Sequence, residues 1–222
     1  MQVKLVSYSQ PSKDMLQSGI EDAQDLIAFC ARVSNPSNQM NTETSEKLIK
    51  YLIKHQHWSP LEMVSACMEI TTTRDIARQI LRHRSFSFQE FSQRYADPTK
   101  DLDFVLRESR LQDPVNRQNS IISEDPVLQA WWNAKQSFII DIAKSTYAEA
   151  IERGIAKEQA RAILPEGNTV SRMYMNGTIR SWIHYIDVRR ANGTQLEHAE
   201  IALEVAKVLA EIFPLTLSLI HI

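Results

Sequence analysis

The sequence predicts an α+β fold in a single domain that covers residues 1–222. Short segments in which apolar and polar residues alternate, as on a half-buried strand, are interspersed with segments in which apolar residues recur every three or four positions, as on a helix. One helical segment is far longer than the others and continues from Asp125 to about Arg153. A chain of 222 residues with 43% hydrophobic residues can also bury one substantial core.

The first third of the chain predicts a strand, two helices and a second strand. Val3–Tyr8 alternates between apolar and polar residues and predicts the opening strand. Asp22–Val33 predicts a helix, and another helix begins near Thr44 and runs towards His55. Met63–Ile70 is an apolar-rich run that we expect to be extended.

Segment 74–95 contains five arginines together with His83, Glu90 and Ser92. Thr73 is suited to cap a helix that runs to about Leu81, since its hydroxyl can accept a hydrogen bond from a first-turn amide. A solvated basic face is the ordinary explanation for one arginine-bearing helix. Here, however, the helix runs into Arg82-His83-Arg84, and Ser85–Phe88 then alternates like a strand. A charged cluster at such a junction indicates a cleft.

The second half of the chain predicts a mixture of short and long elements. Pro126 suits the first turn of the long helix, and Gly154 suits the position after its end. The long helix is expected to be scaffold or subunit interface. The other predicted elements are a strand around Phe104–Leu106, a short helix over Lys157–Leu164, a strand over Ser171–Met175, a helix capped by Thr178 that runs through Val188, and an amphipathic helix over Gln195–Phe213.

Composition and charge exclude several classes of protein. The formal net charge of −2 is unlike that of a nucleic-acid-binding protein, which is expected to be basic overall. Since the basic residues are concentrated locally, a small anion is the expected partner. No apolar run approaches the length of a membrane span, and the N-terminus lacks the features of a signal peptide. We therefore expect a cytoplasmic enzyme that does not bind membranes.

The two cysteines, Cys30 and Cys67, give no sign of metal binding or nucleophilic catalysis. They have no CxxC spacing and form no zinc pattern with the six histidines, so we expect no metal site. Cys67 lies in the apolar run of the second strand, where a small buried thiol is the usual interpretation. Neither resembles an activated nucleophile.

The residues Arg82-His83-Arg84, seven intervening residues and Ser92-Gln93-Arg94 form an RHR-x7-S-x-R pattern. This pattern resembles the signature of the flavin-dependent thymidylate synthases. Further segments of the chain are similar to the same family, namely His57–Glu62, Arg161–Pro165, Arg180-Ser181 and Arg189. The resemblance thus covers nearly the whole chain.

The resemblance implies a fold and a reaction. The fold would be α+β, with a mainly antiparallel sheet flanked by helices, in a homotetramer whose active sites lie at subunit junctions. The reaction would convert dUMP to dTMP, with 5,10-methylenetetrahydrofolate as the carbon donor, NADPH as the reductant of FAD, and hydride supplied by the reduced flavin. No enzyme cysteine would attack the pyrimidine.

The resemblance also assigns roles to individual residues. Arg189 would be catalytic, next to the pyrimidine ring, and His57 would stack near the folate and the flavin. The expected dUMP-binding residues are Gln79, Arg82, Glu90, Ser92, Arg94, Arg161 and Arg189. The expected FAD-binding residues are Ser59, Arg82, His83, Arg84, Glu90, Thr178, Arg180 and His184, with Glu62 a weaker candidate. Thr178 and His184 stand where many relatives have asparagine.

Two other functions compete with the synthase. A non-catalytic nucleotide-binding or flavin-binding module could use the same arginines, although phosphate capture alone needs neither Arg189 nor His57. An RNA-binding domain could stack bases on Phe86, Phe88 and Phe91. The negative net charge and the position of Glu90 among these aromatic residues argue against that alternative.

Overall fold

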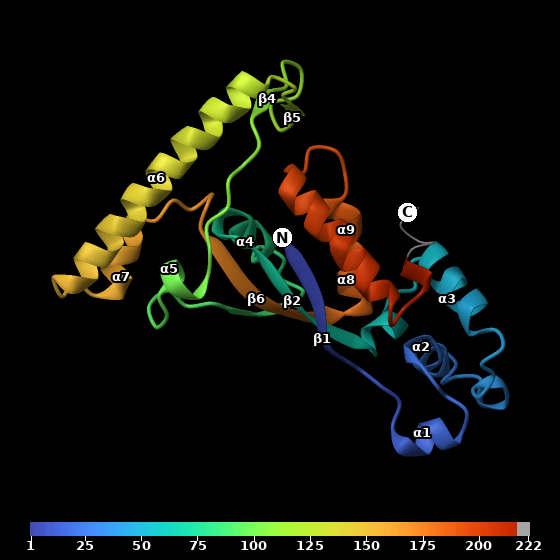
Figure 1. Ribbon diagram of the computed structural model, residues 1–222. Coiled ribbons are helices and arrows are strands. Elements are labelled where there is room, and N and C mark those ends of the chain that lie inside the picture. Colours follow the sequence, from blue (N-terminus) through green and yellow to red (C-terminus); the bar gives the residue numbers. More distant parts are fainter. Residues whose placement is uncertain (217–222) are drawn as a thin grey trace.

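The computed structural model describes residues 1–216 and centres on a four-stranded antiparallel sheet of order β1-β2-β6-β3 (Figure 1). The four strands are β1 (Gln2–Tyr8), β2 (Ser65–Thr73), β3 (Ser87–Glu90) and β6 (Val170–Thr178). The long pair β2 and β6 forms the middle of the sheet, with Ser65 opposite Thr178 and Thr73 opposite Val170. A separate two-stranded hairpin consists of β4 (Arg110–Gln112) and β5 (Ser120–Ile122).

Helices flank the sheet and extend away from it on both sides. The α-helices are α1 (Lys13–Gln17), α2 (Ala23–Ala31), α3 (Ser45–Lys54), α4 (Arg74–Ile80), α5 (Pro98–Asp101), α6 (Pro126–Glu152), α7 (Lys157–Ala160), α8 (Ile179–Arg189) and α9 (Leu196–Ala210). Short 3-10 helices are η1 (Pro36–Asn38), η2 (Ser59–Glu62) and η3 (Arg161–Ile163). α4 and α9 pack on the strands, whereas α6 lies apart from the sheet and contacts α7 and η3 (Figure 1).

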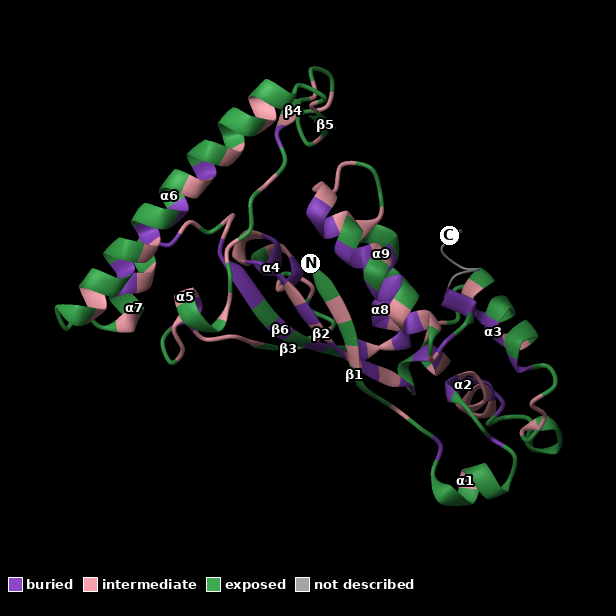
Figure 2. Cartoon of the chain, in the orientation of Figure 1, coloured by how far each residue is buried: buried purple, intermediate pink, exposed green. Residues whose placement is uncertain are grey.

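One face of the sheet forms the main core. Along β2 and β6 the buried residues alternate with more exposed ones, as the period of a strand requires, and Met68, Ile70, Met173 and Met175 are fully buried. These side chains pack with residues of α4, α8 and α9, among them Trp182. α6 is different, because most of its length is exposed (Figure 2).

The predicted fold class is confirmed, and the main helices and strands begin and end near their predicted bounds. Three details were wrong. Only an isolated bridge between Phe104 and Thr169 forms where a strand was expected around Phe104–Leu106. The β4–β5 hairpin and helices α1 and α5 were not predicted. The Thr73 hydroxyl makes no capping hydrogen bond, because it donates to the Asp75 carboxylate and accepts from Nη2 of Arg107 at 2.6 Å.

Thr178 does cap α8 as predicted, since its Oγ1 accepts a hydrogen bond from the amide of Ser181 at 3.3 Å. Within residues 1–216, no helix is both long and apolar enough to cross a membrane.

Candidate active site

The Arg82-His83-Arg84 segment leaves the end of α4 with its side chains pointing to alternate sides. The amide of His83 donates to the carbonyl of Ile80 at 3.0 Å, which closes the last turn. Arg82 and Arg84 are exposed, and neither forms an ion pair with a carboxylate of residues 1–216. His83 is half-buried between them. The loop therefore presents two uncompensated cations to solvent and one imidazole to the interior.

His83 meets Arg189, the last residue of α8, on the inner side of this loop. The Nε–H of Arg189 donates to Nε2 of His83 at 2.7 Å. Burial, and then the nearby charges of Arg189 and Arg82, lower the pKa of His83 to about 4. The imidazole is therefore neutral near pH 7 and can accept this hydrogen bond. The terminal amino groups of Arg189 make no hydrogen bond within the described part of the chain, so the guanidinium is oriented but still has donors to offer.

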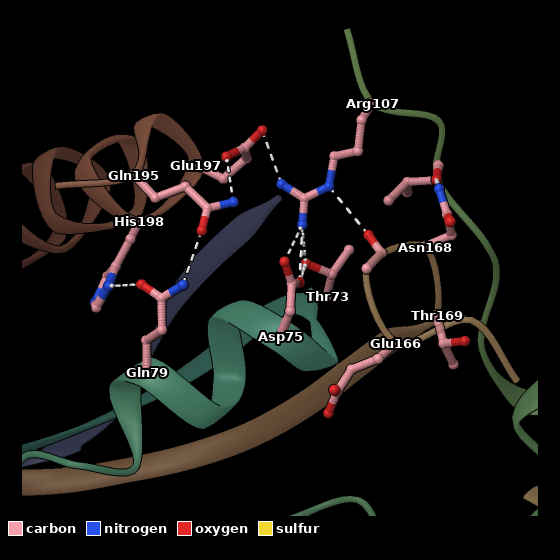
Figure 3. A network of polar contacts seen from close by, with 12 residues as sticks. Thr73, Asp75, Gln79, Arg107, Glu166, Asn168, Thr169, Gln195, Glu197 and His198 are labelled. Atoms are coloured by element: carbon pink, nitrogen blue, oxygen red, sulfur yellow. Dashed lines mark hydrogen bonds and ion pairs between the residues drawn. The ribbon is translucent and has the colours of Figure 1, made fainter. Parts of the chain in front are cut away.

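A network of polar side chains lies near His83, and Figure 3 shows its members Gln79, Gln195, Glu197 and His198. His83 lies edge-on to Tyr185, with ring centroids 4.9 Å apart. The Tyr185 hydroxyl lies 3.1 Å from Nε2 of His198, and Nδ1 of His198 lies 3.2 Å from Oε1 of Gln79. Gln79 in turn donates to Oε1 of Gln195 at 2.8 Å. The predicted residue Gln79 is thus part of a larger polar cluster that the sequence did not reveal.

A basic pocket of about 430 Å³ opens beside α4 and η3. The predicted residue Arg161 lines it, and so do Arg74, Arg78 and Gln93, which were not predicted as site residues. Gln93 is only 3% exposed, and its Nε2 has no hydrogen-bond partner among residues 1–216. A buried amide without a partner is costly, so its presence in a basic pocket indicates a place for an acceptor from a ligand. The i, i+4 spacing of Arg74 and Arg78 on α4 was the signal in the sequence.

Acidic residues hold two of these arginines in place. Arg78 forms an ion pair with Glu166, and Arg74 lies 3.6 Å from Glu90. Glu90 also accepts a hydrogen bond from the hydroxyl of Ser171 at 2.7 Å. Glu90 was predicted to bind ligands, and the structure adds that it orients a pocket arginine.

The other predicted nucleotide residues lie outside the pocket lining. The guanidinium of Arg94 is exposed and lies over the ring of Tyr95. Oγ of Ser92 accepts from the amide of Arg94 at 3.4 Å. In residues 1–216, no hydrogen bond or ion pair joins Arg94 or Arg161 to Gln79 or Arg189. Arg161 lines the basic pocket, whereas Gln79 and Arg189 contact His198 and His83.

The predicted flavin residues of η2 and α8 lie side by side. Glu62 forms an ion pair with Arg180, and the ring of Trp58 lies 4.4 Å from that of His184. Ser59, next to Trp58, is exposed. These contacts bring together two of the sequence segments that resembled the family.

The ring of His57 lies near Tyr51 and His55 instead of near His184. Its side chain is exposed, and its ring lies 6.3 Å from that of Tyr51 and 6.4 Å from that of His55. It makes no ring contact with His184 within the described residues. The stacking role of His57 therefore stays a prediction.

Neither cysteine is placed as a nucleophile. Cys30 lies on α2 and Cys67 on β2, and both are half-buried free thiols. Burial raises the pKa of both thiols, which disfavours the reactive thiolate.

Comparison with known proteins identifies the family. The model of the thymidylate synthase complementing protein family matches residues 15–215. The chain belongs to this family. Among its relatives are the flavin-dependent thymidylate synthase of Synechocystis sp., 48% identical over 214 residues, and the probable flavin-dependent thymidylate synthase of Paramecium bursaria Chlorella virus 1, 45% identical over 214 residues. Each alignment covers 96% of both chains. The family predicted from the sequence is confirmed.

A solved structure confirms the fold. The UMP/dUMP methylase PolB of Streptomyces cacaoi, bound with 5-Br dUMP, superposes with a TM-score of 0.79 at 24% identity. The superposition covers 99% of this chain and 94% of PolB.

Proposed function

We propose that this chain is the subunit of an FAD-dependent thymidylate synthase that converts dUMP to dTMP. It would take the carbon from 5,10-methylenetetrahydrofolate and use NADPH as reductant. The family and the names of the relatives at 45% and 48% identity support the reaction. The observation that carries the proposal is the Arg189–His83 pair, because a neutral imidazole fixes a guanidinium that still has free donors.

Arg189 is the proposed catalytic residue. With its Nε–H bound to His83, its Nη1 and Nη2 groups can donate to an oxygen of the pyrimidine. Negative charge that develops on the ring would be stabilised by this fixed cation, and a preoriented donor needs no reorganisation during the reaction. Phosphate capture alone would not require an arginine held in this way, which favours the enzyme over the non-catalytic module.

The basic pocket of Arg74, Arg78, Arg161 and Gln93 is the proposed site of the dUMP phosphate. Guanidinium groups suit a dianionic phosphate because they donate in pairs to its oxygens. The amide of Gln93 would gain the partner that it lacks in the protein alone. Ser92 and Arg94 lie on either side of Gln93 after β3 and remain proposed dUMP residues.

The residues around η2 and α8 fit FAD by their chemistry. Arg82 and Arg84 are exposed cations that form no ion pair within residues 1–216, so they can bind a pyrophosphate, and Arg180 and His184 lie on α8. When bound, FAD would supply the hydride for the reaction. His83, Glu90, Ser59 and Thr178 remain proposed contacts, although Thr178 already uses its hydroxyl to cap α8.

Self-association as a homotetramer is part of the proposal. Within residues 1–216, Arg161 lines the basic pocket and Arg189 does not, and a second copy would bring the two arginines to one site. α6 carries large apolar side chains on its exposed surface, including Phe138 at 60% and Ile142 at 48% exposure. Such a surface is typical of a subunit interface.

The Arg189→Lys variant tests the catalytic assignment. Lysine keeps the charge, but its single ammonium group cannot replace a guanidinium that donates to His83 and also presents two further amino groups in the same plane. We expect dTMP formation, measured by chromatography with all co-substrates present, to fall by roughly 100-fold or more. Arg190→Lys, at the adjacent position, should change it little. Near-normal turnover by folded Arg189→Lys would contradict the assignment.

A further inference from the structure

A chain of side-chain hydrogen bonds runs from Glu197 through Gln195, Gln79 and His198 to Tyr185, and Figure 3 shows its course from Glu197 to His198. Gln195 donates from Nε2 to Oε2 of Glu197 at 3.0 Å, and Gln79 donates from Nε2 to Oε1 of Gln195 at 2.8 Å. His198 then connects Oε1 of Gln79, at 3.2 Å, with the hydroxyl of Tyr185, at 3.1 Å. The chain thus joins α4, α8 and the start of α9.

Glu197 is held as a carboxylate at one end of this chain. Arg107 lies 2.8 Å from its Oε1, and Arg110 forms a second ion pair with the same oxygen. The two arginines lower the pKa of Glu197 to about 2 against the opposing effect of burial, so it is ionised at any working pH. A carboxylate can only accept hydrogen bonds.

The charge on Glu197 therefore sets the direction of every hydrogen bond in the chain. Gln195 must turn its NH₂ group to the carboxylate, which leaves its carbonyl oxygen for Gln79. Gln79 must then turn its NH₂ group to Gln195 and its carbonyl oxygen to His198. His198 consequently carries its proton on Nδ1, and its Nε2 accepts from the hydroxyl of Tyr185.

The opposite direction is unfavourable at the Glu197 end of the chain. It would place the carbonyl oxygen of Gln195 against the carboxylate of Glu197, where neither group can donate. At the other end, burial raises the pKa of Tyr185, so its hydroxyl keeps a proton to donate. His198 is fully buried and its pKa is lowered to about 3, so it stays neutral and has one nitrogen to donate and one to accept.

We propose that Glu197, Gln195 and His198 are positioning residues that hold the side-chain amide of Gln79 in a single orientation for the nucleotide. The inference rests on the proposed function, in which Gln79 binds dUMP. With Oε1 turned to His198 and one N–H turned to Gln195, the second N–H of Gln79 has no partner in residues 1–216. Gln79 thus offers a donor, and the nucleotide atom that it recognises is an acceptor oxygen of the phosphate or the base.

A double-mutant cycle on the FAD-loaded protein tests the inference. Gln195→Leu removes the link between Gln79 and Glu197 but leaves the ion pairs of Glu197 with Arg107 and Arg110 in place. We expect this variant to raise the Kd for dUMP, measured by calorimetry, by roughly three- to tenfold, the range of one lost hydrogen bond. In a Gln79→Ala background the same change should alter the Kd by less than about twofold, because Gln195 acts through Gln79.

An equal effect of Gln195→Leu in both backgrounds, or none in either, would overturn the inference. Gln79→Glu is the matched control for the donor, since it keeps the shape but cannot donate when ionised, and it should weaken dUMP binding at least as much as Gln79→Ala.

Nitrogen-15 NMR of histidine-labelled protein gives a readout that needs no nucleotide. His198 should show the Nδ1–H tautomer, and Glu197→Gln should reduce its dominance, because a neutral amide no longer fixes the direction. An Nε2–H tautomer in the wild-type protein would overturn the inference and leave the proposed function intact. Failure of the wild-type protein to bind dUMP would instead overturn the proposed function, and the role assigned to Gln79 with it.

Discussion

Gln93 is the residue whose environment most directly indicates a bound ligand. It lies between the signature residues Ser92 and Arg94, and the pattern gave no reason to choose it. Its side chain is buried in the basic pocket with Nε2 unsatisfied. An unsatisfied buried donor destabilises the free protein, whereas a phosphate oxygen in the pocket would satisfy it.

Gln93→Leu should therefore weaken dUMP binding without destabilising the nucleotide-free protein. We expect the Kd for dUMP to rise by roughly three- to tenfold, and the Tm of the nucleotide-free protein to stay the same or increase, because the unpaired amide is gone. Calorimetric titration and thermal unfolding measure the two effects. Gln89→Leu, on the exposed side of β3, serves as the control. Unchanged dUMP affinity in Gln93→Leu would remove the pocket from the nucleotide site.

A sequence motif can identify residues that bind the ligand themselves, but not residues that only hold others in position. Arg161 and Arg189 were chosen in this way, and Arg161 lines the basic pocket while Arg189 pairs with His83. Gln195 and Gln79 are 116 positions apart, and nothing in the sequence shows that they touch. Such partners become visible only in the folded chain.

At the scale of elements, β6 and the loop that carries Arg82–Arg84 fit together through Gly177. A Cβ atom at Gly177 would overlap the ring of Phe86, which packs against Trp182 with centroids 4.7 Å apart. Phe86 lies two residues after Arg84, and its packing fixes where this loop leaves the core. Because Gly177 of β6 has no side chain, the ring of Phe86 can pack there and fix the position of the Arg82–Arg84 loop.

Gly177→Ala should displace Phe86 and destabilise the protein by about 1–3 kcal/mol, as expected for overpacking. Urea unfolding measures this change, and binding of FAD should weaken with it. Gly167→Ala is the matched control, because the nearest atom lies 3.9 Å from its Cβ position. Partial recovery of stability in Gly177→Ala/Phe86→Leu would support the packing explanation, whereas a Gly177→Ala protein as stable as the wild type would refute it.

The elements with regular patterns were predictable, and those without were not. β2 and α4 lie near their predicted bounds because their period marks them, and α6 and α8 because caps mark them as well. The β4–β5 hairpin has only three residues in each strand and lies in a polar segment, where the alternation is too short to recognise. Its position is held instead by tertiary contacts, such as the ion pair between Arg110 and Glu197.

At the scale of the whole molecule, the separation of Arg161 from Arg189 leads to a complementation test. If each site combines Arg161 of one subunit with Arg189 of another, Arg161→Ala and Arg189→Ala should each be inactive alone. Co-expressed one to one, they should form intact sites at about a quarter of the positions, with activity to match. Initial rates of dTMP formation measure the recovery.

The co-expressed mixture would stay inactive if both arginines belonged to one chain's site, and this result would contradict the shared-site proposal. A mixture of Arg161→Ala with the wild type controls for expression and assembly.

In the proposed reaction, reduced flavin supplies the hydride and neither Cys30 nor Cys67 acts as a nucleophile. The most direct measurement is the visible absorbance of bound FAD in the Cys30→Ser/Cys67→Ser protein, reduced anaerobically with NADPH and then mixed with dUMP and 5,10-methylenetetrahydrofolate. We predict that the flavin is reoxidised and that one dTMP forms for each flavin oxidised. Formation of dTMP without flavin oxidation, or loss of dTMP formation in the folded variant when the wild-type protein forms it, would contradict the claim.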